Sequence, residues 1–192
     1  MQNQYLEDLL YEVGLISKKV QADFGRLNAQ QLNWKPALNQ WSIAQCLDHL
    51  IKSNEQYFPM LEEVAKGTRK TTFMERLPVL PGFFAKMMLQ ALDPSNEKKR
   101  KSPASFTPSA SQLPASVVAD FVQHQQQLVR LVQATNQADH VRTIVSSPIS
   151  GLITFSLQDA VRILVVHEER HFMQAKRVLR SKGFPQASGQ RV

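Results

Sequence analysis

The sequence contains few of the residues that hold secreted or β-rich proteins together. Cys46 is the one cysteine, so no disulfide can form within the chain, which is typical of proteins in a reducing compartment. There are only 7 glycines, and strands rich in β-branched residues between glycine turns are not evident. We therefore expect a cytoplasmic protein that is not built on a β-sheet.

Long apolar runs are missing as well. No run of about 18 apolar residues occurs, so we expect no segment that spans a membrane. The first residues, MQNQYLEDLLYEV, carry acidic side chains early and lack the basic flank and apolar centre of a signal peptide. The sequence therefore predicts a soluble protein without a membrane partner.

The length and composition are those of an ordinary globular domain. The chain has 192 residues, of which 43% are hydrophobic and 20% charged, so we expect a single domain over residues 1–192. The formal net charge of +7 permits an acidic partner but does not require one. The basic run KKRK at 98–101 is flanked by proline and serine, with only Phe106 nearby for base stacking. We interpret it as a solvated loop and expect no nucleic-acid partner.

Four segments have apolar residues at steps of three and four, the spacing of amphipathic helices. The first extends over about 6–27 and the second over 42–67, with Pro59 expected to kink or shorten the second. The third begins near Pro114, and the fourth extends over 156–183.

Cap residues support the ends of these helices. Ser42 and Gln45 have the spacing of a capping box, and Ser156 is expected to cap its helix toward Asp159. Gly67 is expected to end the second helix, and Gly183 should end the fourth in the same way.

Residues 67–112 are rich in proline and predict a long connection with one short helix near 81–92. We expect disorder over 96–111. The apolar piece PGFFAKMMLQAL at 81–92 is interpreted either as a dimer interface, as a lid, or as packing over one end of the domain. A long connection lets the second and third helices run parallel, so the predicted fold is an all-α four-helix bundle with a crossover at 67–112 and a tail at 184–192.

The stretch HEERHFMQ at 167–174 places two histidines four residues apart on the apolar stripe of the last helix. Two such histidines can bind one metal ion, or they can be core histidines bonded to their neighbours, and the spacing alone does not decide. The pattern H-E-x-x-H also occurs in zinc peptidases, where Glu168 would be the general base. A peptidase needs a third ligand, usually downstream, and no His, Asp, Glu or Cys follows His171. That interpretation is therefore disfavoured.

A third ligand must come from earlier in the chain, where four residues qualify. His49 lies at the edge of the apolar stripe of the second helix, and Cys46 lies one turn before it. We interpret Cys46 as a small core residue rather than a ligand or reactive thiol. His124 lies at a stripe edge of the third helix and is interpreted as a flank residue, although a fourth ligand or a substrate-facing acid or base remains an alternative. His140 lies in a polar connection and is expected at the surface.

The phrase WSIAQCLDHL at 41–50, followed far downstream by HEERHFMQA at 167–175, resembles the DinB/YfiT-like family. The resemblance covers most of the chain, from the first helix to the last. It implies a four-helix bundle with parallel middle helices and a divalent metal bound by His49, His167 and His171.

This resemblance also implies a chemistry. Three imidazoles leave one position for water or substrate, as in catalytic zinc sites, while nickel or iron would also accept these ligands. Relatives of the family suggest a metal-dependent hydrolase or a transferase of a low-molecular-weight thiol, acting on a small-molecule substrate as a homodimer. Glu168 faces nearer the helix seam than Glu169 and is the candidate base or partner of the ligands, with a solvated flank residue as its alternative. Asp48 and Glu169 are expected to be solvated. The alternative function is a non-catalytic, metal-binding, dimerising stress-response protein.

Overall fold

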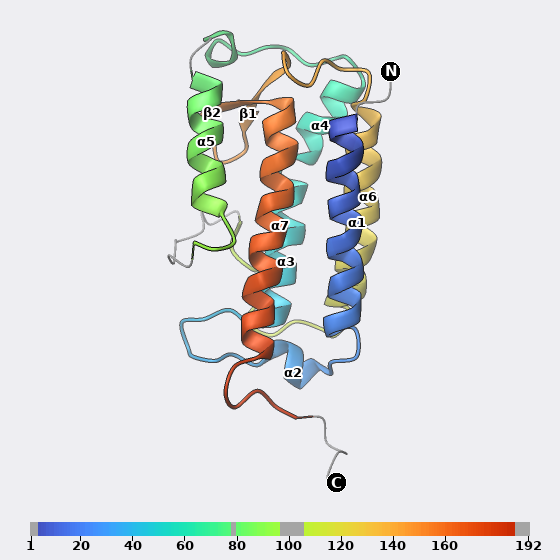
Figure 1. Cartoon of the computed structure of the whole chain (residues 1–192), viewed down its shortest axis with the longest axis vertical. Coiled ribbons are helices and arrows are strands. Elements are labelled where there is room, and N and C mark those ends of the chain that lie inside the picture. Colours follow the sequence, from blue (N-terminus) through green and yellow to red (C-terminus); the bar gives the residue numbers. More distant parts are fainter. Residues whose placement is uncertain (1–3, 78–79, 97–105, 187–192) are drawn as a thin grey trace.

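The structure, a computed structural model, describes residues 4–77, 80–96 and 106–186, and it is mostly helical (Figure 1). The all-α class is therefore confirmed at this coarse level. The basic run at 98–101 lies outside the described residues, as does most of the stretch expected to be disordered. The elements in chain order are α1 (Gln4–Phe24), α2 (Ala29–Asn33), α3 (Ile43–Glu55), α4 (Phe58–Ala65), the short 3-10 helix η1 (Met74–Arg76), α5 (Leu80–Leu92), α6 (Val117–Ala134), β1 (Ile144–Ser147), β2 (Ser150–Ser156) and α7 (Leu157–Leu179).

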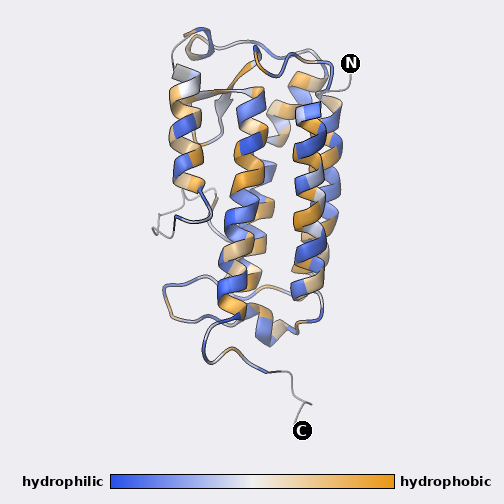
Figure 2. Ribbon diagram, in the orientation of Figure 1, coloured by the Kyte–Doolittle hydropathy of each residue, from blue (hydrophilic) through white to orange (hydrophobic). Residues whose placement is uncertain are grey.

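The long helices lie side by side around a shared core (Figure 1). Both α1 and α3 contact α6 and α7. Each helix presents one hydrophobic and one hydrophilic side, as Figure 2 shows. Fully buried side chains come from all of these helices and from β2, among them Phe24, Leu47, Phe121, Phe155 and Leu164. Burying one such side chain stabilises the fold by roughly 1.5–3 kcal/mol.

The predicted N-caps of the second and fourth helical segments are confirmed, whereas α7 ends at Leu179 with Arg180 as its C-cap and not at Gly183 as predicted. The backbone N–H of Gln45 donates to Ser42 Oγ at 3.1 Å, and Gln45 Oε1 accepts from the backbone N–H of Ser42 at 3.3 Å. At the start of α7, the backbone N–H of Asp159 donates to Ser156 Oγ at 3.0 Å. These bonds satisfy donors that the first turn of a helix leaves unpaired, so they fix where α3 and α7 begin.

Pro59 and Gly67 act on the second helical segment as predicted. The segment is divided into α3 and α4, and Pro59 occupies the first turn of α4, where no helical donor is lost. Gly67 has φ 64°, and its N–H donates to the carbonyl of Val64 while Thr68 donates to that of Glu63. This is a Schellman ending, which favours glycine because the left-handed conformation is costly for other residues. The break lets α4 contact α6.

A β-hairpin was not predicted. Strands β1 and β2 pair antiparallel, with Val145 opposite Phe155, both fully buried. The strands are short, and the two residues that connect them, Pro148 and Ile149, are not one of the glycine-containing pairs typical of tight hairpins, so the local sequence does not mark this hairpin. Buried Glu75 holds the hairpin in place, because Ser146 Oγ donates to its Oε1 at 2.7 Å and Arg69 pairs with the same oxygen while donating to the carbonyl of Ile144.

The described end of the connection between α5 and α6 is ordered against α3, contrary to the disorder expected there. Residues 106–110 run along one face of α3. Lys52 donates to the carbonyl of Thr107, Asp48 accepts two bonds from Ser109, and Gln45 donates to the carbonyl of Ala110. Asp48 was expected to be solvated, but it anchors this segment. The short helix predicted near 81–92 corresponds to α5, which packs against α7 and β2.

No helix among the described residues is both long and apolar enough to cross a membrane.

Candidate metal centre

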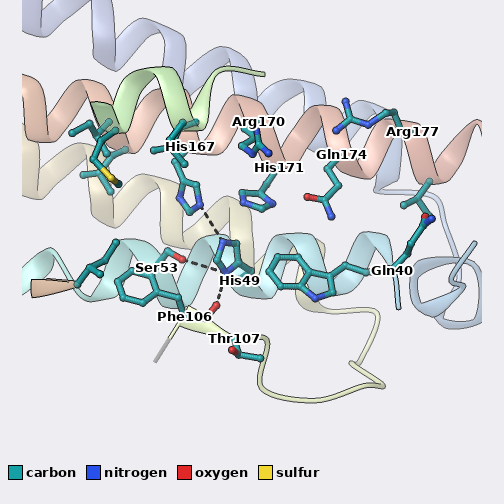
Figure 3. Close-up of a pocket in the computed structure, with 18 of the residues that line it drawn as sticks. Gln40, His49, Ser53, Phe106, Thr107, His167, Arg170, His171, Gln174 and Arg177 are labelled. Atoms are coloured by element: carbon teal, nitrogen blue, oxygen red, sulfur yellow. Dashed lines mark hydrogen bonds between the residues drawn. The ribbon is translucent and has the colours of Figure 1, made fainter. Parts of the chain in front are cut away.

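Three histidines from two helices converge at one point. His49 lies on α3, and His167 and His171 lie one turn apart on the facing side of α7 (Figure 3). Their candidate ligand atoms all lie within 4.8 Å of one another. The two Nε2 atoms of His49 and His167 are 3.1 Å apart, and the ring centroids of His49 and His171 are 4.4 Å apart. The i, i+4 spacing on α7 and the contact of α7 with α3 are sufficient to bring the three rings together.

The backbone fixes the tautomer of His49. Its Nδ1 donates a hydrogen bond to the carbonyl oxygen of Phe106, and a carbonyl oxygen can only accept. Ser53 Oγ lies 3.4 Å from the same nitrogen. The proton is therefore on Nδ1, and Nε2 directs a lone pair toward His167. A carbonyl that holds the outer nitrogen of a histidine is the usual support of a metal ligand.

The three residues fit a tetrahedral divalent metal such as zinc. Two nitrogens bound to one zinc ion at about 2.0–2.1 Å lie roughly 3.3–3.4 Å apart, close to the observed 3.1 Å between His49 and His167. His171 Nδ1 is buried without a hydrogen-bond partner, a costly arrangement that a shared metal ion would relieve. The donor set of three imidazoles suits zinc, and it also suits nickel or iron.

The electrostatics keep all three rings neutral. Burial lowers the pKa of His167 to about 3, and the neighbouring charges of His49 and Arg170 act in the same direction. Burial also lowers the pKa of His171 well below its ordinary value, again with help from His167, His49 and Arg170. The pKa of His49 is lowered by burial too, although its bond to Phe106 opposes the change. Neutral imidazoles are the form that binds metals.

Trp41 closes one side of the cluster. Its ring stacks on His171 with centroids 5.6 Å apart and lies 4.8 Å from the ring of His49. In the sequence Trp41 is recognisable only as part of the WSIAQCLDHL motif, and its contact with the histidines depends on the packing of α3 against α7. Because the residue directly precedes the cap of α3, its placement depends on where that helix begins.

The cluster opens into a cavity of about 780 Å³ between α3, α5 and α7. Its wall includes all three histidines, Trp41 and the buried Tyr57. A cavity of this size can hold a small organic molecule. The site is therefore accessible to a ligand and is not a closed structural centre.

Glu168 is fully buried, contrary to the alternative that it is a solvated flank residue. Its Oε1 accepts from Asn54 Nδ2 and from Gln125 Nε2, both at 2.7 Å. Burial raises the pKa of its carboxyl group to about 7, and the bonds from Gln125 and Asn54 oppose that rise. Glu168 points to α6 and is not among the residues that line the cavity. Glu169 is exposed, as expected.

The other three candidates do not join the cluster. His140 was expected at the surface, which is wrong: it is buried, and its Nε2 donates to the carbonyl of Thr135 at 3.1 Å. His124 is also buried, and it stacks on Phe58 with ring centroids 5.1 Å apart. Cys46 lies in the core, where burial raises the pKa of its thiol to about 12. A thiol with so high a pKa is unreactive at neutral pH.

The fold and the cluster together define a helical protein with a candidate three-histidine metal centre. The family model of the DinB superfamily matches residues 18–175, and the chain belongs to this superfamily of metal-binding proteins. The chain is also similar to a Bacillus subtilis (strain 168) protein named "Uncharacterized protein YuaE", with 28% identity over 157 residues that cover 79% of this chain and 85% of that protein. No solved structure matches the chain.

Proposed function

We propose that the protein is a divalent-metal-dependent enzyme of the DinB superfamily, in which His49, His167 and His171 bind the metal, with zinc as the proposed ion. The observation that carries the proposal is the convergence of three neutral imidazoles on the wall of a ligand-sized cavity. We further propose a four-helix bundle made by α1, α3, α6 and α7, with residues 67–112 as its crossover. The pairwise contacts of these helices support that arrangement.

The reaction classes follow from the ligand set. Three protein ligands leave a coordination position open, and a metal held in this way activates a bound water or thiol by lowering its pKa. The proposed activity is therefore either hydrolysis or transfer of a low-molecular-weight thiol to a small-molecule substrate. Around that centre, Phe106 orients His49 through its carbonyl group, and Trp41 shields His171 from water.

We assign Glu168 a structural part in this proposal rather than the role of base. Its carboxylate ties α7 to Asn54 of α3 and Gln125 of α6, directly beside His167 in the chain. It thereby fixes the rotation of α7 that turns His167 and His171 toward His49.

A non-catalytic, dimerising metal protein is the second proposal. The dimer in this proposal is supported by one observation: Phe83 and Met87 on α5 are 64% and 42% exposed, four residues apart on one face. Light scattering at micromolar concentration tests the dimer. The mass of a monomer would contradict dimerisation for both proposed functions.

The test of the proposed centre is the metal content of the untagged protein, purified without chelator, as wild type, His49→Ala and His124→Gln. We expect near-stoichiometric metal in the wild type and in His124→Gln, which alters a buried histidine outside the cluster. The affinity of His49→Ala should fall at least tenfold. Wild-type protein that holds no metal after reconstitution with zinc, nickel and iron would contradict the proposal.

A further inference from the structure

The cavity changes character along α7. The residues of α7 that line it follow steps of three and four, so they form one face of the helix. Before the histidines this face carries Ile163 and Leu164. After them it carries Gln174 and Arg177, together with the apolar Val178. The candidate metal centre therefore lies between an apolar end and a polar end of the same cavity.

The polar end is cationic. Figure 3 shows Gln174, Arg177 and Gln40 on one side of the histidine cluster, with Ser53 and Phe106 toward the other. Arg170 adds a second guanidinium group to the wall beside His171, and its position is fixed because it donates to the carbonyls of Asp93 and Asn96. Among the described residues that line the cavity there is no Asp or Glu. A ligand in this end therefore meets guanidinium groups and no carboxylate on the wall itself, although the carboxylate of Asp93 acts on Arg170 from outside the wall.

The apolar end is built from three separate elements. Met88 and Leu92 of α5 line it together with Ile149, which connects the two strands of the hairpin. These side chains offer no donor or acceptor, so they favour a hydrocarbon group over a charged one. The contacts of α5 with α7 and with β2 bring the three elements together.

We propose that the cavity binds a small molecule bearing an oxyacid group, a carboxylate or a phosphate, which lies against Arg177 and Gln174 while the reactive part of the molecule reaches the three histidines. The planar guanidinium group of arginine matches such groups with two parallel hydrogen bonds. Arg177 follows His171 by six residues, which is about 9 Å along the helix axis. The oxyacid group should therefore lie several bonds from the reactive atom, as in a short peptide. Apolar groups of the ligand or of a co-substrate occupy the end near Ile149.

This inference rests on the proposed function, and the two can fail separately. The probe pair is glutathione and its diethyl ester, which share one thiol and differ in their two carboxylates. Their affinities for the zinc-loaded protein are measured by calorimetry, with tryptophan fluorescence as a second readout in a Trp34→Phe background, since Trp41 lines the cavity and Trp34 does not. The variants are Arg177→Gln and, as a matched control, Arg180→Gln. Arg180 is exposed, does not line the cavity, and loses the same charge on substitution.

We expect the wild type and Arg180→Gln to bind glutathione at least tenfold more tightly than the diester, a difference of about 1.4 kcal/mol. In Arg177→Gln the two probes should bind alike. Equal affinities in the wild type, or equal losses in both variants, would overturn the inference. Competition by acetate or by inorganic phosphate then assigns the oxyacid class. Zinc content is measured on the same samples. A wild type without zinc counts against the metal centre. A wild type with normal zinc that binds glutathione and its diester equally counts against the oxyacid site alone.

Discussion

The Nδ1 atom of His49 donates its proton to the carbonyl oxygen of Phe106, which lies 57 residues further along the chain. The bond joins a candidate metal ligand on α3 to the segment that leads into α6. This segment is held in turn by Asp48, whose carboxylate accepts from the N–H of Ser109 at 2.6 Å and from its hydroxyl at 2.9 Å. The orientation of His49 therefore depends on how firmly Ser109 is anchored.

Replacing Asp48 by alanine should weaken metal binding although Asp48 is no ligand in the proposed centre. Without its two bonds to Ser109, the carbonyl of Phe106 is less well placed to hold His49, and loss of such outer support typically reduces metal affinity about 10–100-fold. Because Asp48 acts through a backbone segment, we expect the lower part of this range. The measurement is a zinc titration with a competing chromophoric chelator.

Glu55→Ala is the control for Asp48→Ala, because Glu55 is exposed on the same helix and is also acidic. It should bind zinc like the wild type. If both variants lose affinity equally, the effect of Asp48 is one of charge and does not pass through Phe106.

The parts of this structure that local sequence rules govern could be predicted. The spacing of apolar residues placed the long helices, and Ser42, Ser156 and Gly67 marked their ends because caps depend on residues three positions apart. His49, His167 and His171 were selected by motif resemblance, and the helix periodicity of α7 turned two of them to one side.

Features that depend on tertiary contacts could not be predicted. The burial of His140 follows from its bond to Thr135 in the turn after α6, whereas its polar neighbours in the sequence suggested the surface. Phe106 contributes through its backbone carbonyl, which no side-chain pattern reveals. The partners of Glu168 on α3 and α6 are separated from it by 114 and 43 residues, so only the packed helices bring them together.

His124 should make the fold sensitive to acid. Burial lowers the pKa of its imidazole to about 4, while the unfolded chain keeps a value near 6.5. A lowered folded-state pKa gives stability that is fully present above about pH 6.5 and is lost as the pH falls toward 4, because the unfolded state binds the proton first. The shift corresponds to about 2–3 kcal/mol at most between these pH values.

The variant His124→Gln tests this by removing the titrating group. Urea unfolding at pH 7 and at pH 4.5 should show a smaller loss of stability for the variant than for the wild type. The difference between the two proteins cancels the contributions of the other buried histidines. An identical loss in both proteins would show that His124 does not bind a proton on unfolding.

Glu75 should be the residue on which the docking of the hairpin depends. Burial raises the pKa of its carboxyl group, but the bonds from Ser146, Thr72 and Arg69 outweigh that effect and hold the pKa below its ordinary value. Glu75→Ala leaves the guanidinium of Arg69, whose side chain is only 12% exposed, without its carboxylate partner. Breaking a buried pair in this way costs about 3–5 kcal/mol of stability, which thermal unfolding measures.

Glu62→Ala is the control. It removes only an exposed pair with Lys66 and should change the stability by less than about 1 kcal/mol.

Variants of Glu168 test whether its carboxylate orients the neighbouring histidines or acts as a catalytic base. Glu168→Gln keeps an oxygen that accepts from Asn54 and Gln125, so it should retain zinc affinity within about threefold and lose at most about 1 kcal/mol of stability. Glu168→Ala leaves two buried amide donors unpaired and a cavity between three helices, which should cost about 3–5 kcal/mol and weaken zinc binding as α7 rotates. Chemical unfolding and zinc titration of both variants separate the cases. If Glu168→Gln binds zinc normally but has no activity in an assay in which the wild type is active, Glu168 is the catalytic base. If Glu168→Gln retains both zinc binding and activity, Glu168 acts by positioning His167 and His171.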